Sequence, residues 1–108
     1  MKKLAIILFF FVFTNLNSTE IKFEKILDNL NKPWSLSFID KENVIITEKE
    51  GKLLFFNLKN KNVGEIKHNL SLISLGQGGL LDVLYYDKQV YISYSENRGN
   101  WETSTSVA

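Results

Sequence analysis

The sequence predicts an all-β protein assembled from blades of the β-propeller type. Short alternating or apolar segments are separated by polar connections of hairpin length that are rich in Asn, Asp and Gly, and such connections suit antiparallel strands. The same order of segments begins again near residue 79. Because four short strands in about 36 residues are the unit of a propeller blade, we expect one blade and part of the next. A four-stranded meander in an ordinary sandwich is the alternative.

The strands can be placed in order along the chain. In "EIKFEKILDNLNK", Ile21 and Phe23 alternate with charged residues, which predicts a short strand with one solvated face. After the only proline, Pro33, the segment "WSLSFI" alternates large apolar residues with serines. The first blade is expected at residues 34–39, 43–49, 52–58 and 63–69, and the second begins with 79–86, 88–96 and 102–108.

The first 18 residues are expected to be a secretory signal peptide. A pair of lysines is followed by an unbroken apolar run, Leu4 to Phe13, which is shorter than the roughly 20 residues that a bilayer span needs. We therefore expect a signal peptide at 1–18, a propeller domain over 19–108, no stable membrane span, and secretion, with the periplasm as the destination. Because Leu16 poorly matches the small residue usual two places before a cut at Ser18, an uncleaved anchor is the alternative.

Composition excludes several classes of protein. The hydrophobic fraction of 44% is far from that of a disordered chain. There is no cysteine, so an exported chain must be stabilised by packing instead of disulfides. Loss of the signal peptide changes the formal charge from +1 to −1. Because phosphate binding needs a clustered positive field, we expect no nucleic-acid partner.

The length predicts an incomplete stack of blades. Blades bury one face against the next, and a continuous core usually needs three or more units. We therefore expect incomplete cover at Leu53, Phe55, Leu81 and Val83, and we interpret the chain as the N-terminal piece of a longer protein. A small secreted β domain complete at 108 residues is the alternative.

Three ordered segments resemble one enzyme family. They are "NKPWSLSFIDKENVIITEKEGKLLFFNL" (31–58), "GQGGLLDV" (76–83) and "VYISYSE" (90–96). In this order they resemble the soluble quinoprotein sugar dehydrogenases, the glucose/sorbosone dehydrogenase family, over roughly residues 28 to 108. The connection at 85–89 departs from the family pattern because it is shorter than the usual turn.

The resemblance implies a six-bladed β-propeller that oxidises the anomeric carbon of aldose sugars. Pyrroloquinoline quinone (PQQ) and Ca²⁺ are the implied cofactors, and a sugar and an electron acceptor are the implied partners. In such enzymes the catalytic histidine, the cofactor-binding arginines and the calcium-binding segment come later than residue 108. No catalytic or metal-binding residue is therefore assigned here, and we expect this fragment alone to be inactive.

Gln77 is the residue that the resemblance places in the cofactor and substrate pocket. An amide suits that position because it both donates and accepts hydrogen bonds and stays neutral. Its neighbours Gly76, Gly78 and Gly79 would let the backbone approach the ligand and turn sharply into the next strand. The alternative for Gln77 is a hydrogen bond to a loop carbonyl.

Other polar and aromatic residues favour structural roles. Asp82, within an apolar strand, is expected to be a buried carboxylate bonded to a neighbouring turn. Thr47 and Glu48 are expected as a hydrogen-bonding pair at a blade end. Trp34 is expected in the core, with sugar stacking as the alternative for it and for Trp101. His68 is the only histidine, and its place at the end of a weak strand predicts an exposed outer edge and no role as a base.

Two functions from different classes remain open at this point. The leading hypothesis is an exported quinoprotein aldose dehydrogenase. The alternative is a secreted propeller that recognises carbohydrate or protein without turnover. A histidine opening an inner strand farther along the chain, beside an arginine-lined quinone pocket, would decide for the enzyme.

Overall fold

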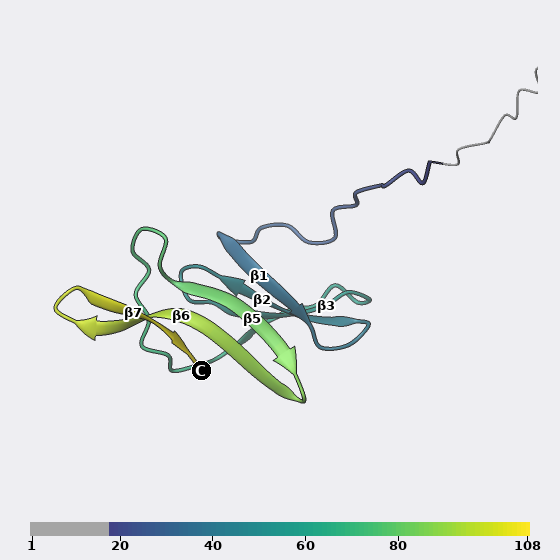
Figure 1. The fold of residues 1–108 in the computed structure, drawn as a ribbon. Helices are drawn as coiled ribbons and strands as arrows, with labels where there is room; N and C mark the ends of the chain where they lie inside the picture. Colours follow the sequence, from purple (N-terminus) through teal and green to yellow (C-terminus); the bar gives the residue numbers. More distant parts are fainter. Residues whose placement is uncertain (1–17) are drawn as a thin grey trace, which may run out of the picture.

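The structure is a computed structural model that describes residues 18–108; residues 1–17, which hold nearly all of the expected signal peptide, lie outside the described residues. The described part contains strands in two antiparallel sheets and no helix (Figure 1). The first sheet has the order β1 (Pro33–Phe38), β2 (Asn43–Glu48), β3 (Leu53–Asn57), β4 (Val63–Ile66), and the second has the order β5 (Leu80–Tyr86), β6 (Gln89–Gly99), β7 (Glu102–Val107). The all-β prediction is confirmed, and each segment expected in the two blades corresponds to one strand.

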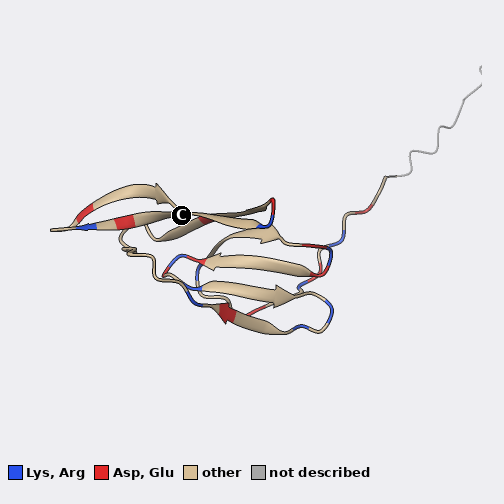
Figure 2. Cartoon of the chain, turned by 90° about the horizontal axis from the view of Figure 1, so that it is seen from below, with Lys and Arg blue, Asp and Glu red and all other residues tan. Residues whose placement is uncertain are grey.

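Turn chemistry explains why consecutive strands pair as hairpins. Asp40 Oδ1 accepts hydrogen bonds from the backbone N–H groups of Glu42 and Asn43, at 2.8 and 2.9 Å, which closes the β1–β2 turn. Asp87 and Lys88, between β5 and β6, have φ angles of 48° and 64°, the paired positive values that the tightest two-residue hairpins need. Charged residues gather in such connections, and the strands carry few of them (Figure 2).

The main core lies between the two sheets. β1 and β5, the first strands of the two sheets, lie side by side (Figure 1). Side chains of β2, β3, β5 and β6 fill the space between the sheets, and Ile45 and Leu80 are 1% and 0% exposed. The buried members of this cluster are Ile45, Leu53, Leu80, Val83, Ile92 and Tyr94.

This core is better covered than the sequence predicts. Of the four side chains expected to lack cover, Phe55 and Leu81 are indeed partly exposed. Leu53 and Val83 are each 4% exposed, so the prediction was wrong for these two. The reason is that each of them faces the other sheet, and a single sheet is enough to cover that face.

The outer face of the first sheet is only partly covered. It carries a second apolar cluster of Val44, Ile46, Leu54 and Phe56. Next to this cluster, the large side chains of β1 remain open to solvent in the described part of the chain. Trp34, Leu36 and Phe38 are 51%, 55% and 57% exposed.

The prediction that Trp34 belongs to the core was therefore wrong. The alternation along β1 was correctly identified, but the buried side of the strand is the one with the serines. Ser37 Oγ accepts a hydrogen bond from the Tyr85 N–H at 2.9 Å, so the serine side of β1 faces β5. Because side chains alternate along a strand, Trp34 and its apolar companions face the other way.

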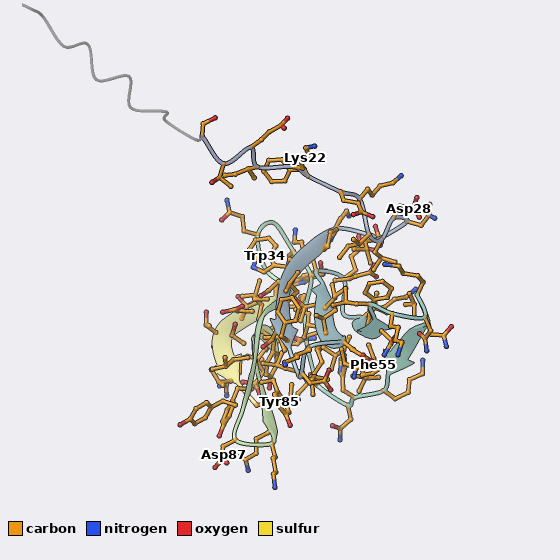
Figure 3. All side chains as sticks on the ribbon, turned by 90° about the vertical axis from the view of Figure 1, so that its right-hand side faces the viewer. Lys22, Asp28, Trp34, Phe55, Tyr85 and Asp87 are labelled. Carbon is orange, nitrogen blue, oxygen red and sulfur yellow. The ribbon has the colours of Figure 1, made fainter. Side chains whose placement is uncertain are left out.

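The predicted strand near Ile21 and Phe23 does not form. The two side chains are 77% and 97% exposed, and residues 18–30 contain neither strand nor helix. Figure 3 shows the part with Lys22 leading away from the sheets. Alternation alone gave this segment an apolar face, but no neighbouring strand accepts its backbone hydrogen bonds. Its later residues Leu27 and Leu30 pack instead on the outer cluster of the first sheet.

Candidate functional site at the Gln77 loop

The Gln77 loop, residues 76–79, completes the connection between the two sheets and enters β5. The Gly78 N–H donates to the Leu75 carbonyl at 2.7 Å, which closes a turn around Gly76 and Gln77. Gln77 is exposed, and its side-chain amide makes no hydrogen bond within residues 18–108. In Figure 1 the loop leading into β5 projects beyond the strands. An unbonded amide is thus presented to solvent at one end of the junction between the sheets.

The three glycines of this loop have different structural surroundings. Gly79 is buried with a φ angle of 147°, and a Cβ there would lie 2.1 Å from the Lys49 carbonyl oxygen. A Cβ on Gly78 would lie 2.8 Å from Ser95 Oγ. Gly76 has a φ angle of 54° and open space around it. Gly78 and Gly79 thus pack closely against other parts of this chain, whereas Gly76 has open space on its Cβ side. The predicted approach of the three glycines to a ligand stays a prediction.

Hydrogen bonds fasten the loop to both sheets. The Leu80 N–H donates to the Lys49 carbonyl at 2.9 Å, in the β2–β3 turn of the first sheet. The Ser95 N–H of β6 donates to the Gly79 carbonyl at 2.8 Å, and the Ile73 N–H donates to the Ser95 carbonyl at 2.9 Å. Lys49 also reaches the other end of the loop, because its Nζ donates to the Gly76 carbonyl. The structure thus brings "TEKEG" and "GQGG" together, which the sequence does not predict.

A row of polar contacts joins the innermost strands of the two sheets. Thr47 is fully buried, and its Oγ1 donates to the Leu81 carbonyl at 2.6 Å. The same oxygen accepts from the Ser35 N–H at 3.1 Å. One hydroxyl therefore satisfies a donor of β1 and an acceptor of β5.

Asp82 belongs to the same row. Its Oδ1 accepts hydrogen bonds from Ser35 Oγ and, at 2.9 Å, from the Val83 N–H. The structural role expected for Asp82 is therefore correct, but two details were wrong. The residue is exposed, and it binds a strand instead of a turn. A bulge in β5 between Leu80 and Val83 shifts the register here and explains why an acidic residue can lie within an apolar strand.

Glu48, like Thr47, is hydrogen-bonded at the end of β2 as expected, although the two side chains do not bond to each other. Glu48 is 3% exposed, and its Oε1 accepts from the Asn31 N–H at 2.6 Å. Two residues on, hydrogen bonds from Lys32 and then Asn31 hold the pKa of Glu50 below its ordinary value. These contacts fix the entry into β1 against the β2–β3 turn.

His68 follows the edge strand β4, as predicted, but it is not exposed, so that part of the prediction was wrong. The ring is half-buried beyond the end of β4. Its Nδ1 accepts from the Leu70 N–H at 3.3 Å, and its Nε2 lies 2.7 Å from the Gly51 carbonyl oxygen. With Nδ1 accepting, Nε2 is the ring nitrogen that can donate to the Gly51 carbonyl. Because both nitrogens are occupied, this geometry favours a structural role.

The remaining candidate residues lie apart from the loop. Trp101 is 83% exposed in the β6–β7 turn and has no partner in the Gln77 loop. Within residues 18–108, no group of three or more acidic, histidine or cysteine side chains has the geometry to hold a metal ion. The same residues include no helix that is long and apolar enough to cross a membrane.

Two consecutive meander sheets, packed through their first strands and joined by a glycine-rich loop, define a protein of the β-propeller class. Comparison with known families gives the particular group. The family described as glucose/sorbosone dehydrogenase matches residues 30–108. The chain belongs to this family, which confirms the resemblance found in the sequence.

Individual relatives agree with this assignment. The aldose sugar dehydrogenase YliI of Escherichia coli (strain K12) is 28% identical over 93 residues, covering 81% of this chain and 25% of the relative. A solved glucose dehydrogenase structure is 31% identical with a TM-score of 0.71, covering 78% of this chain and 26% of that one.

A third relative shares the fold at lower identity. The PQQ-bound form of an aldose sugar dehydrogenase from Streptomyces coelicolor has a TM-score of 0.65 at 17% identity, covering 78% of this chain and 26% of that one. These likenesses confirm the predicted fold class. The chain spans only about a quarter of the length of the relatives described.

Proposed function

We propose that these residues supply the first blade and part of the second blade of an exported PQQ-dependent sugar dehydrogenase. The complete protein would be a six-bladed propeller that oxidises the anomeric carbon of aldoses and passes the electrons to an acceptor. The observation that carries this proposal is the Gln77 amide, which is exposed and unbonded on a loop fastened to both sheets. Family membership supports the oxidoreductase class.

Gln77 fits the edge of a pocket for a quinone and a sugar. The quinone presents carbonyl oxygens and the sugar presents hydroxyl groups, and a neutral amide can donate to the carbonyls and both donate to and accept from the hydroxyls. When bound, PQQ supplies the redox chemistry by accepting the hydride of the sugar. The role of this chain would be to orient ligand oxygens through Gln77 and to keep the Gln77 loop in one conformation while the quinone and the sugar bind.

The other pocket groups would come from the rest of the complete protein. Calcium prefers several oxygen ligands, usually with carboxylates among them. No acidic cluster of that kind occurs within residues 18–108. We therefore propose that the calcium ligands, the base and the charged groups for the quinone all lie outside this chain, and that the chain alone is inactive.

Uncovered apolar surface supports a place within a larger stack of blades. On the outer face of the first sheet, Leu36 and Phe38 are 55% and 57% exposed. On the far side of the second sheet, Leu84 and Val107 are 55% and 69% exposed, and they line a shallow hollow with Asp82, Tyr91 and Ser93. Each face would be covered by one neighbouring blade, since blades pack face to face.

Export to the periplasm is part of the same proposal. It rests on the charged and apolar pattern at residues 1–18. Cell fractionation with N-terminal sequencing of the mature protein tests it. We expect a periplasmic protein that begins near Thr19. Cytoplasmic protein that retains Met1 would contradict this part of the proposal.

The activity is tested on the complete protein, with the reading frame continued beyond Ala108. The purified protein is loaded with PQQ and Ca²⁺, and reduction of an artificial electron-accepting dye is measured with a panel of aldoses. We expect dye reduction that depends on sugar, PQQ and Ca²⁺ together. Tight PQQ binding without turnover of any sugar would contradict the dehydrogenase assignment. Sugar binding without turnover would favour the non-catalytic binding module.

A further inference from the structure

We propose that Lys49 is a positioning residue for Gln77. Lys49 lies in the β2–β3 turn of the first sheet, whereas Gln77 lies on the loop that enters the second. The hydrogen bonds of Lys49 hold both ends of the Gln77 loop. The consequence for sugar turnover rests on the proposed function, but the consequence for the loop itself does not.

Each polar group of Lys49 has a defined partner. Its backbone N–H donates to the Lys32 carbonyl at 3.0 Å, just before β1. Its carbonyl accepts from the Leu80 N–H at 2.9 Å, at the far end of the loop. Its side-chain Nζ donates to the Gly76 carbonyl, at the near end. The main chain of Lys49 therefore anchors one end of the loop, and its ammonium group anchors the other.

The two ends of the loop depend on Lys49 to different degrees. Gly79 packs so closely that a Cβ would lie 2.1 Å from the Lys49 carbonyl oxygen, and this contact needs only the backbone of Lys49. Gly76 has nothing within 4 Å of the position a Cβ would occupy. Its carbonyl is held by the Lys49 ammonium group alone among the hydrogen bonds of residues 18–108. Truncating the lysine side chain should therefore free this end selectively.

Freeing the Gly76 carbonyl should disturb Gln77 directly. This carbonyl belongs to the peptide group that joins Gly76 to Gln77. The orientation of that peptide plane therefore sets the direction in which the Gln77 side chain points. Gly76 has a φ angle of 54°, and glycine resists rotation less than other residues do. A charge-assisted hydrogen bond is the kind of contact that can hold such a peptide in one orientation. Because the pair is exposed, we expect loss of precision at the loop without loss of the fold.

The first experiment measures the loop without any reference to activity. Hydrogen exchange by mass spectrometry is followed in the complete protein for a peptide that covers residues 74–80. Lys49→Met keeps the length of the side chain and removes the donor, Lys49→Arg keeps a donor, and Lys52→Met is the matched control on the same turn. With Lys49→Met we expect exchange in this peptide to be faster by about threefold or more, since local opening controls exchange. We expect Lys49→Arg and Lys52→Met to resemble the parent protein.

The second experiment asks whether Lys49 acts through Gln77. Lys49→Met is expected to lower kcat/KM for an aldose by about three- to tenfold, with an unchanged melting temperature. In a double-mutant cycle, the same change made in a Gln77→Ala background should have almost no further effect, since residues that act together are not additive. Lys49→Arg is expected to restore most of the loss.

The outcomes separate this inference from the proposed function. Unchanged exchange at residues 74–80 in Lys49→Met would overturn the positioning role, whatever the activity. An equal drop in kcat/KM in the parent and Gln77→Ala backgrounds would also overturn it. If the complete protein oxidises no sugar, the dehydrogenase proposal fails, and the exchange experiment alone decides the role of Lys49.

Discussion

The two faces of the first sheet differ in how completely they are covered. The inner face packs on the second sheet, and its residues Ile45 and Leu53 are 1% and 4% exposed. Within residues 18–108, the outer face is partly covered by Leu27, Leu30 and Leu58, and Leu36 and Phe38 stay more than half exposed. Along β1 the outer face is the more apolar of the two, because the inner face carries Ser35 and Ser37. The difference supports the proposal that one face of this blade is covered within the chain and the other face by a further blade.

The comparison also separates two kinds of contact between strands. Apolar side chains between the sheets supply most of the burial, because burying apolar surface is the main favourable contribution to folding. At the junction of β1 and β5, serine and threonine hydroxyls replace apolar contacts. These hydroxyls fix the register of two strands that share no backbone ladder. They therefore contribute alignment as well as stability.

The largest effect is expected between the sheets. Leu80 is fully buried, and Leu80→Ala should lower the free energy of unfolding of the complete protein by about 2–5 kcal/mol. Urea denaturation followed by circular dichroism measures the change. The control is Leu75→Ala, because the Leu75 side chain beside the Gln77 loop is half-exposed. This change should lower the free energy of unfolding by less than about 1 kcal/mol. Equal effects at the two positions would contradict a core between the sheets.

The outer face gives the next test, in the complete protein. If another blade covers it, Phe38→Ser should lower the free energy of unfolding by about 2–4 kcal/mol, close to the cost in a core. Phe23 is 97% exposed on the N-terminal segment, so Phe23→Ser is a matched control within about 0.5 kcal/mol of the parent. A Phe38→Ser protein as stable as its control would show that nothing covers this face.

The polar junction is expected to give a smaller effect. Thr47→Val keeps the shape of the side chain but removes the hydroxyl, which leaves the Leu81 carbonyl and the Ser35 N–H without their partner. Leaving buried polar groups unsatisfied should cost about 1–3 kcal/mol. The exposed Thr105 of β7 provides the control Thr105→Val. Stability unchanged by Thr47→Val in urea denaturation would show that the junction contributes nothing to folding.

The strands and turns were largely predictable from the sequence because their signals are local. Polar turn residues such as Asp40 and the pair Asp87 and Lys88 fix hairpins through contacts within a few residues. The short connection at 85–89 is simply a tight hairpin. The family resemblance could also be detected in the sequence, because its motifs occur in the same order along the chain.

Features that depend on distant partners were not predictable in the same way. The alternation in β1 was visible, but which side is buried depends on the hydroxyls that meet β5, and these are assigned only by the fold. The same limit applies to Lys49, whose partners lie at Lys32, Gly76 and Leu80. One signal was available for it, namely its place directly before the glycine turn of "TEKEG". The prediction of a strand near Phe23 was wrong for the opposite reason. The local alternation was present, but no neighbouring strand pairs with this segment.

Kinetics of Gln77→Ala in the complete, cofactor-loaded protein test the central claim most directly. The claim is that this chain contributes Gln77 to the pocket where sugar and quinone meet. Because one lost hydrogen bond of about 1.4 kcal/mol corresponds to a tenfold change in rate, we predict a loss of kcat/KM for aldoses of about tenfold. The melting temperature should stay unchanged, since the amide is exposed and makes no hydrogen bond within the described residues. Turnover equal to that of the parent protein, with any of the sugars it oxidises, would contradict the claim.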